Sequence, residues 1–340
     1  MYQAPDKQIW KGRIDPEDGA KGLRWHQVVK PLKLNQEVQL SGQEKNIAFL
    51  GFCCDEGVRR NKGRVGAQQG PDALRQAMAS LPVHFNSEKV ALFDAGNVIC
   101  PNRNLETAQE LLGQKIAYLL EHGYFPVLLG GGHEIAYGHY LGIHQHLKKY
   151  SEAAFGIINI DAHFDLRSYA RDSSSGTPFR QIADLRKNHN KDFQYLCLGI
   201  QPTGNTPALF SAAKQFDTKY LLAEEVRESK LPVIKKKINS WLDKKDWIYL
   251  TLDLDAVSAA HAPGVSAPSA HGLDPFVVRE LILHLIRSGK VLSMDIAELC
   301  PLHDQDQHTA KLAAGYVFEV VQAIAAAATS KTTDSEDPVK

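Results

Sequence analysis

Three short polar clusters in the sequence contain the residue types that bind divalent metal ions. Each cluster follows an apolar run: GGGHE occupies 130–134, DAHFD occupies 161–165 and DLD occupies 253–255. Carboxylates that are buried close together are costly without a cation, so such a group calls for positive charge. Carboxylate and imidazole ligands favour Mn²⁺ or a similar divalent ion over an all-sulfur zinc site. Two ions that share carboxylates could activate one water molecule for hydrolysis.

Each cluster by itself also has an ordinary structural explanation. GGGHE alone is typical of a glycine-rich turn before a helix, and an isolated DLD is more often a surface acidic pair. DAHFD is a stronger signal, because alternation along an extended segment would place its three polar side chains on one side. The occurrence of all three clusters at predicted strand ends favours a shared metal site. The candidate ligands are His133, Asp161, His163, Asp165, Asp253 and Asp255.

Short apolar runs alternate with longer helical patterns, and these elements must position the clusters. The runs lie at 46–51, 90–93, 126–129, 157–160, 194–198, 220–222, 248–252 and 291–294. Runs without polar alternation are typical of strands that are covered on both faces. Helical patterns such as 105–121 and 274–288 lie between them, and 310–328 predicts a final packing helix. The sequence therefore predicts an α/β fold with a largely parallel, eight-stranded sheet, in which ligands gather beyond the carboxyl ends of the strands.

The composition fits one globular domain or at most two. The chain has 340 residues, of which 44% are hydrophobic, and its 39 basic and 39 acidic residues give a formal net charge of zero. This balance excludes the basic excess that is typical of nucleic-acid-binding proteins, and the hydrophobic content excludes global disorder. We expect an N-terminal arm or small subdomain over 1–44, a single catalytic domain over 45–329 and a frayed tail over 330–340.

The sequence also predicts a cytoplasmic protein. The N-terminus has no basic segment followed by an apolar stretch, and no run reaches the roughly 18 apolar residues of a membrane span. The cysteines, at Cys53, Cys54, Cys100, Cys197 and Cys300, are scattered without a CxxC pattern, which indicates a reducing compartment. We therefore expect neither a membrane nor a nucleic acid among its partners.

The three clusters resemble motifs of the ureohydrolase superfamily, which includes arginase, agmatinase and formimidoylglutamase. The stretch 253–273, DLDAVSAAHAPGVSAPSAHGL, extends this resemblance, which covers 45–325. The resemblance implies a three-layer α/β/α fold with a central eight-stranded parallel sheet, and a centre of two Mn²⁺ ions. It implies that one ion is held by His133, Asp161, Asp165 and Asp253. It implies that the other is held by Asp161, His163, Asp253 and Asp255, with Asp161 and Asp253 bridging.

The loop after DAHFD separates the members of this superfamily. Arginases and agmatinases carry a histidine there that assists proton transfer, whereas 173–180 reads SSSGTPFR. This loop resembles that of formimidoylglutamases, as do 54–61 and 262–268. We therefore expect hydrolysis of N-formimidoyl-L-glutamate to L-glutamate and formamide. Three alternatives stay open: another guanidino- or amidino-acid hydrolase of the superfamily, a metal-binding regulatory protein without turnover, and an amide deacetylase.

The resemblance also implies roles for residues around the metal ions. Glu298 would face the substrate's amidine nitrogen, and Asp165 would carry a proton from the metal-bound water to the leaving amine. Because the substrate is anionic, we expect an arginine to bind its carboxylates. The candidate substrate-binding residues are Arg59, Arg60, Arg64, Arg167 and Arg180, together with Thr177. Family members often form oligomers, so we expect a homo-oligomer, and we expect His139 to be a packed or surface histidine.

Overall fold

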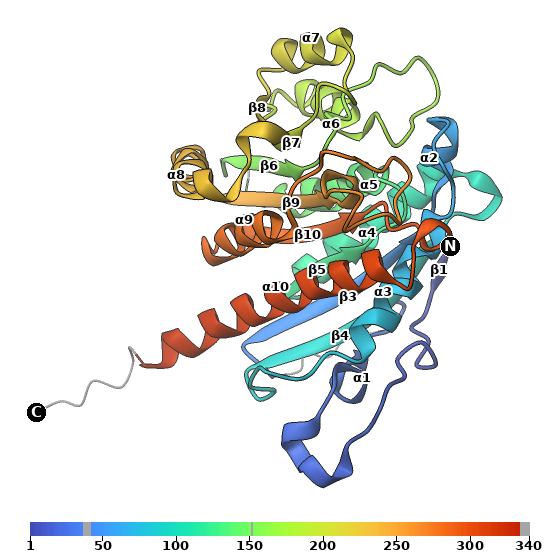
Figure 1. Cartoon of the computed structure of the whole chain (residues 1–340), viewed down its shortest axis with the longest axis vertical. Helices are drawn as coiled ribbons and strands as arrows, with labels where there is room; N and C mark the ends of the chain where they lie inside the picture. Colours follow the sequence, from blue (N-terminus) through green and yellow to red (C-terminus); the bar gives the residue numbers. More distant parts are fainter. Residues whose placement is uncertain (37–41, 151, 334–340) are drawn as a thin grey trace, which may run out of the picture.

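The computed structural model describes residues 1–36, 42–150 and 152–333 (Figure 1). A single twisted sheet runs through this part of the chain, and helices cover both of its faces. The tail was predicted over 330–340. Its first residues, 330–333, form the end of the last helix, α10 (His308–Thr333), and 334–340 lie outside the described residues.

Eight parallel strands form the body of the sheet, as the apolar runs predict. The strand order is β1-β4-β3-β5-β10-β9-β6-β7-β8, and β2 also pairs with β4. Among the described residues, the antiparallel pairing is that of β1 with β4. The strands are β1 (Tyr2–Gln3), β2 (Lys30–Pro31), β3 (Lys45–Cys53), β4 (Val90–Ile99), β5 (Tyr124–Leu129), β6 (Phe155–Ile160), β7 (Tyr195–Ile200), β8 (Lys219–Leu222), β9 (Trp247–Asp253) and β10 (Val291–Ala297).

Two helical layers sandwich the sheet (Figure 1). Helices α1 (Trp25–Val28), α3 (Gly70–Ala79), α8 (Leu231–Leu242), α9 (Pro275–Arg287) and α10 bury side chains in one apolar core. Helices α4 (Leu105–Glu121), α5 (Ile135–Leu147), α6 (Pro178–Asn188) and α7 (Pro207–Gln215) bury theirs in a second core on the other face. The short α2 (Glu56–Arg60) follows β3 at the carboxyl edge of the sheet. The predicted three-layer α/β/α fold is confirmed.

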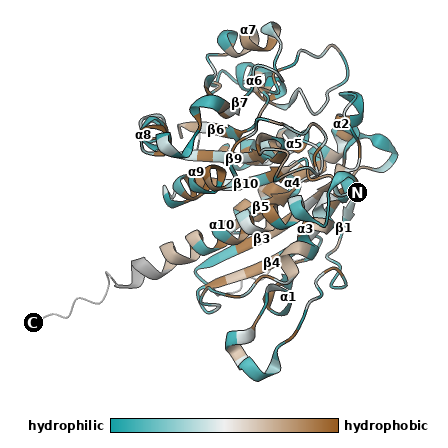
Figure 2. Cartoon of the chain, in the orientation of Figure 1, coloured by the Kyte–Doolittle hydropathy of each residue, from teal (hydrophilic) through white to brown (hydrophobic). Residues whose placement is uncertain are grey.

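The central strands are largely apolar because both of their faces are covered. In β3, Ile47 and Phe49 belong to one core, whereas Ala48 and Leu50 belong to the other. Figure 2 shows this apolar centre, with hydrophilic segments mainly in the peripheral helices and loops. Successive strand side chains point to opposite faces, so a strand buried on both sides has no polar period.

The N-terminal segment packs onto the edge of the same sheet. Its strands β1 and β2 pair with β4, and Trp25 is fully buried with its ring stacked on Phe49 at 5.8 Å. The indole N–H of Trp10 donates to Asp94 of β4 at 2.8 Å. The predicted boundary at residue 44 stays a prediction, and 37–41 beside it lie outside the described residues.

Helix α10 has the length and composition of a membrane-spanning helix over His308–Ala328. Half of this stretch is nevertheless buried inside the protein, where Val317, Val320 and Val321 join the core beneath α3 and α9. A helix that is apolar around much of its circumference is equally typical of a large protein core.

Strand β4 continues well beyond the predicted apolar run at 90–93 because a buried arginine partners its polar residues. Arg75 of α3 is 1% exposed and donates to Asp94 at 2.9 Å, to the carbonyl of Gly96 at 2.8 Å and to Asn97 at 2.8 Å. Buried polar groups are tolerated when they are hydrogen-bonded. This arginine therefore ties α3 to the edge of the sheet where the N-terminal segment docks.

We predict that Arg75→Met lowers the free energy of unfolding by about 3–5 kcal/mol, because it leaves the carboxylate of Asp94 buried without its cation. Urea denaturation followed by circular dichroism measures the loss. Arg13→Met is the control, since Arg13 is 75% exposed in its ion pair with Asp15. Exposed pairs contribute at most about 1 kcal/mol. Equal losses in the two variants would contradict the prediction.

Candidate metal centre

The three polar clusters meet because the strands that precede them are neighbours. GGGHE follows β5, DAHFD follows β6 and DLD ends β9, and the strand order places β5, β10, β9 and β6 side by side in the middle of the sheet (Figure 1). All four strands are parallel, so their carboxyl ends lie at one edge. Glu298 follows β10 directly and joins the clusters there. Ligand sites of open α/β sheets lie at this edge.

The glycines of GGGHE let the loop lie against the ends of two other strands. Gly130 donates to the carbonyl of Ile296 in β10 at 2.7 Å, and Gly131 donates to the carbonyl of Phe52 in β3 at 2.9 Å. A Cβ atom at Gly131 would lie 1.9 Å from the carbonyl oxygen of Cys54. The backbone must therefore approach more closely than any side chain permits. This close packing fixes the position of His133 at the end of the loop.

The DAHFD segment is not extended, so the alternation we expected does not bring its side chains together. Strand β6 ends at Ile160, and the chain turns when Asp161 accepts a hydrogen bond from the N–H of His163 at 2.6 Å. Asp165 has a left-handed backbone with φ of 49°. The turn places Asp165 beside His133 and His163 beside Asp255, with Asp161 between the two histidines. Such strained backbones in non-glycine residues cluster at functional sites.

The first group of candidate ligands surrounds the imidazole of His133. Its Nδ1 atom lies 3.1 Å from Asp161, 3.0 Å from Asp165 and 3.1 Å from Asp253. One atom from each of the four side chains falls within 4.8 Å of the others. His133 and Asp161 are almost completely buried. This arrangement offers one nitrogen and three oxygens to a single cation.

The second group shares Asp161 with the first. The Nδ1 atom of His163 lies 3.0 Å from Asp255 and 3.6 Å from the other oxygen of Asp161. Asp253 belongs to the first group and uses its second oxygen to accept the N–H of Asp255 at 2.8 Å. That bond closes the turn after β9 and turns the side chain of Asp255 toward His163. The structure thus brings all six predicted ligands into two adjoining groups.

The pKa values of these groups show how crowded the negative charge is. Burial raises the pKa of Asp253 well above its ordinary value, and the charges of Asp255 and Asp161 raise it further. Burial also raises the pKa of Asp255. The charge of Asp255 raises the pKa of His163 to about 12. The raised pKa values of Asp253 and Asp255 mean that their ionised forms are unfavourable in these surroundings. A divalent cation bound between the carboxylates would stabilise the ionised forms.

Several buried polar atoms lack hydrogen-bond partners among the described residues, and they point to the same conclusion. Nδ1 of His133, Oδ1 of Asp255 and Oε2 of Glu298 are all in this state. Three carboxylate oxygens approach His133 Nδ1, but none of them completes hydrogen-bond geometry. Unpartnered buried polar atoms are rare and call for an explanation. Converging lone pairs fit divalent metal ions, which mixed carboxylate and imidazole sites bind.

Glu298 lies beside these groups and is held by the GGGHE loop. Its Oε1 atom accepts the N–H of His133 at 2.7 Å, and its own N–H donates to the carbonyl of Gly131 at 2.8 Å. Its backbone is left-handed, with φ of 69°. Burial raises the pKa of Glu298 to about 7, although the interactions of its carboxylate with Ser266 and with the N–H of His133 lower the pKa. One carboxylate oxygen is thus anchored while the other stays available.

A cavity of about 180 Å³ opens onto the two groups. Its lining includes His133, His163, Asp165, Asp253, Asp255 and Glu298. Three further polar residues, Asn61, Ser175 and Ser266, line it and were not among the predicted site residues. They lie in loops whose sequences resemble those of the family. A polar residue in a loop is common, however, so a single sequence does not show that these three line a site. Their side chains give the cavity uncharged hydrogen-bonding groups.

Comparison with known proteins identifies the family. A model of the arginase family matches residues 45–322. The chain belongs to the arginase family. It is 44% identical to the formimidoylglutamase of Clostridium tetani over 95% of this chain and 96% of that protein. It is 46% identical to the formimidoylglutamase of a Geobacillus species over 94% of this chain and 96% of that protein.

Solved structures agree with this assignment. A crystal structure of Trypanosoma cruzi formiminoglutamase with Mn²⁺ superimposes with a TM-score of 0.74 at 26% identity, covering 84% of this chain and 96% of that one. The formimidoylglutamase of Bacillus subtilis has a TM-score of 0.75 at 22% identity over 93% of this chain and 94% of its own, which supports the fold.

Among the predicted substrate-binding arginines of this arginase-family chain, Arg167 lines the cavity. Its side chain is exposed and forms no ion pair with the described residues. The structure does not bring Arg180 to the cavity: its guanidinium lies 4.6 Å from the ring of Phe216 and 3.5 Å from Asp184. Arg64 instead donates to the carbonyls of Val265 and Ser266 and holds the 262–268 loop in place.

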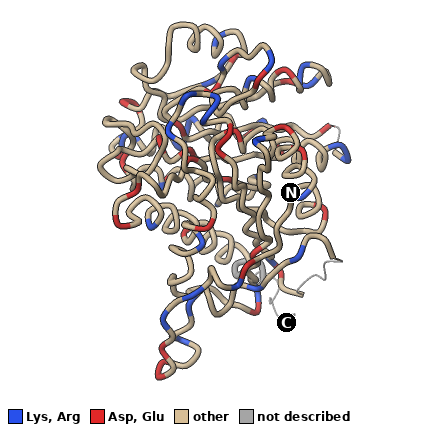
Figure 3. Tube along the Cα trace, turned by 90° about the vertical axis from the view of Figure 1, so that its right-hand side faces the viewer, with Lys and Arg blue, Asp and Glu red and all other residues tan. Residues whose placement is uncertain are grey.

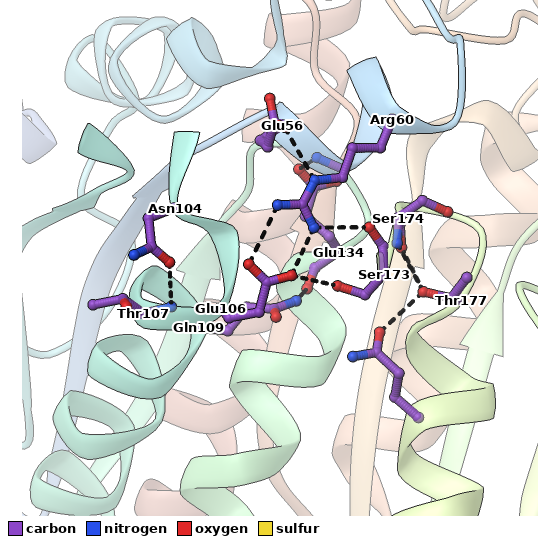
Figure 4. A network of polar contacts seen from close by, with 12 residues as sticks. Glu56, Arg60, Asn104, Glu106, Thr107, Gln109, Glu134, Ser173, Ser174 and Thr177 are labelled. Atoms are coloured by element: carbon purple, nitrogen blue, oxygen red, sulfur yellow. Dashed lines mark hydrogen bonds and ion pairs between the residues drawn. The ribbon is translucent and has the colours of Figure 1, made fainter. Parts of the chain in front are cut away.

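Arg60 belongs to a polar network beside the cavity (Figure 4). It donates to Glu56 at 3.0 Å, to Glu106 at 2.6 Å and to the carbonyl of Ser173 at 3.1 Å. Arg59 is 46% exposed and pairs with Glu56. These contacts join α2 to α4 and to the loop that precedes α6. Both guanidinium groups are thus occupied by the protein's own carboxylates.

Thr177 is buried at the start of α6. Its hydroxyl accepts the N–H of Ser174 at 2.9 Å and lies 3.0 Å from Gln181 (Figure 4). These bonds close the turn of the 173–180 loop, and Thr177 does not line the cavity described above. The loop places Ser175 against the cavity instead.

We predict that Gly131→Ala displaces the GGGHE loop, because the added methyl group meets the carbonyl of Cys54. Overpacking of this kind costs about 1–3 kcal/mol in the free energy of unfolding. We also expect weaker Mn²⁺ binding, measured by calorimetric titration of the metal-stripped protein. Gly315→Ala is the control, since no atom lies within 4 Å of its Cβ position. The prediction is wrong if Gly131→Ala binds Mn²⁺ as well as this control.

Proposed function

We propose that this protein is a formimidoylglutamase that hydrolyses N-formimidoyl-L-glutamate to L-glutamate and formamide. The observation that carries the proposal is the 44% identity to a formimidoylglutamase over 95% of this chain. The 173–180 loop supports the choice of substrate, because it offers serine and threonine where arginases and agmatinases are expected to carry a histidine. Among the described residues, the histidines that line the cavity are His133 and His163.

Two Mn²⁺ ions are part of this proposal. His133, Asp161, Asp165 and Asp253 would hold one ion, and Asp161, His163 and Asp255 would hold the other, to which the family resemblance adds Asp253. The four carboxylates of this set balance the charge of two divalent cations. Bound ions supply Lewis-acid activation of water and stabilise the negative charge that develops during hydrolysis.

Glu298 would orient the cationic end of the substrate. Its Oε1 is anchored, its Oε2 is buried without a hydrogen-bond partner among the described residues, and the residue lines the cavity. A protonated amidine can donate a charge-assisted hydrogen bond to that oxygen. This contact would hold the formimidoyl carbon beside the metal-binding groups, where the reaction takes place.

Asp165 would carry the proton that the leaving amine requires. Its carboxylate lines the cavity beside His133, and burial raises its pKa with a further contribution from Asp161. A carboxyl group whose pKa is raised can hold and release a proton during turnover. Breaking the carbon–nitrogen bond then yields the amino group of glutamate.

Arg167 is the arginine we favour for the substrate's carboxylates, because it lines the cavity while the other candidates are engaged elsewhere. We also propose that the protein acts in the cytoplasm as a homo-oligomer on this small anionic substrate. Its five cysteines are free, and its acidic and basic residues are interspersed along the chain (Figure 3). Mixed charges of this kind favour a small-molecule partner over a nucleic acid, which clustered basic residues bind.

We predict that Asp161→Ala abolishes both Mn²⁺ binding and the release of glutamate from formimidoylglutamate, because Asp161 contributes an oxygen to each group of ligands. Metal content by atomic absorption and a coupled glutamate assay measure the two losses. Asp184→Ala is the control, since Asp184 is 41% exposed in its pairing with Arg180. Urea release from arginine or agmatine that exceeds glutamate release from formimidoylglutamate would overturn the choice of substrate.

We predict that Arg167→Ala raises KM for formimidoylglutamate about 10- to 100-fold, the equivalent of losing a hydrogen bond to a charged group. Arg180→Ala should leave KM nearly unchanged, because its guanidinium lies over Phe216. Steady-state kinetics at saturating Mn²⁺ compare the two variants. A larger effect of Arg180→Ala would reverse the assignment.

A further inference from the structure

A chain of buried hydrogen bonds leads from His133 into the centre of the protein. Nε2 of His133 lies 3.0 Å from the hydroxyl of Thr251 in β9. That hydroxyl donates to Oδ1 of Asp295 in β10 at 2.5 Å. Thr251 and Asp295 are direct neighbours in the parallel register of the two strands. All three side chains are at most 1% exposed, so no solvent can substitute for these bonds.

Asp295 accepts on its other oxygen as well. Oδ2 receives the hydroxyl of Tyr249 at 2.5 Å and lies 2.6 Å from Nδ1 of His139 in α5. The far nitrogen of His139 lies 2.7 Å from the hydroxyl of Ser293. Of the two expectations for His139, a packed or a surface histidine, the structure shows the packed one, and its partner is a carboxylate. Asp295 thus accepts on both oxygens from three side chains.

The direction of these bonds determines which nitrogen of His133 carries its proton. The hydroxyl of Thr251 donates its single hydrogen to Asp295, so it can only accept a hydrogen bond from His133. Nε2 of His133 must then carry a hydrogen and donate it. In the neutral ring, the lone pair lies on Nδ1, which faces Asp161, Asp165 and Asp253. A metal ligand requires that nitrogen to be unprotonated.

We propose that Asp295 and Thr251 are positioning residues that fix the tautomer and orientation of His133 for metal binding. This inference rests on the proposed metal centre. Partners that bond the second nitrogen of a ligating histidine raise its basicity and hold its ring. Here the carboxylate acts through a threonine hydroxyl, and the strand register of β9 and β10 sets the geometry. A network that only tied α5 to the sheet would not need the bond from His133 to Thr251.

The test compares Mn²⁺ affinity in variants that break the network at different points. Thr251→Val removes the hydroxyl between His133 and Asp295, and should weaken Mn²⁺ binding about 10- to 100-fold. Thr251→Ser keeps the hydroxyl and should restore the affinity. Tyr249→Phe also removes a 2.5 Å bond to Asp295 but lies off the path to His133, so it should bind Mn²⁺ like the unchanged protein. Titration of the metal-stripped full chain, with free Mn²⁺ followed by electron paramagnetic resonance, gives each affinity.

Thermal unfolding of the same variants separates positioning from stability. We expect both Thr251→Val and Tyr249→Phe to lose stability, and Thr251→Val to lose more, since Oδ1 of Asp295 then has no donor whereas Oδ2 keeps His139. Unchanged Mn²⁺ affinity in Thr251→Val, or an equal loss in Tyr249→Phe, would overturn the inference. Asp161→Ala in the same titration tests the metal centre independently. If that variant keeps its Mn²⁺, the proposed centre itself fails, whatever Thr251→Val does.

Discussion

Four carboxylates gathered at the carboxyl ends of the neighbouring strands β6 and β9 are the constraint on which the site depends. Asp161 is fully buried, and Asp253 and Asp255 are nearly so, close enough that the charge of Asp161 raises the pKa values of the other two. Charge of one sign in so small a volume is unfavourable unless a cation shares it. The rest of the site can be understood as the means of holding these groups together in spite of that repulsion.

The loops at this edge are built for close approach. Gly131 packs where a methyl group would overlap the Cys54 carbonyl, and Asp165 and Glu298 adopt left-handed backbones. Hydrogen bonds from backbone N–H groups, such as that of His133 to Glu298, hold these conformations in place. Strain of this kind persists only where the surrounding structure determines the conformation from several sides. The two helical layers supply that support by burying the central strands on both faces.

Polar side chains also run into the sheet beneath the site. Thr251 and Asp295 lie in the largely apolar strands β9 and β10, and both are fully buried. A buried network is favourable when each member has its partner. By joining His133 to His139, this one links the loop after β5 with the helix that follows it. The acidic edge and the core are therefore parts of one hydrogen-bonded structure.

The sequence by itself determined the class of fold and the identity of the chemical groups. Unbroken apolar runs predicted strands covered on both faces. The polar clusters at the ends of these runs predicted the side chains that the structure brings together. Both predictions were possible because the type of a side chain and the end of a strand can be recognised from the local sequence. Only the tertiary structure decided that β5, β10, β9 and β6 are neighbours, since strand order depends on contacts between distant segments. It likewise decided that a turn after β6, rather than alternation, divides DAHFD between two groups, and that Arg167 reaches the cavity whereas Arg60 and Arg180 find partners elsewhere. The sequence alone does not distinguish an arginine that binds substrate from one that forms an ion pair. Its role depends on which carboxylate lies nearest to it in the folded chain.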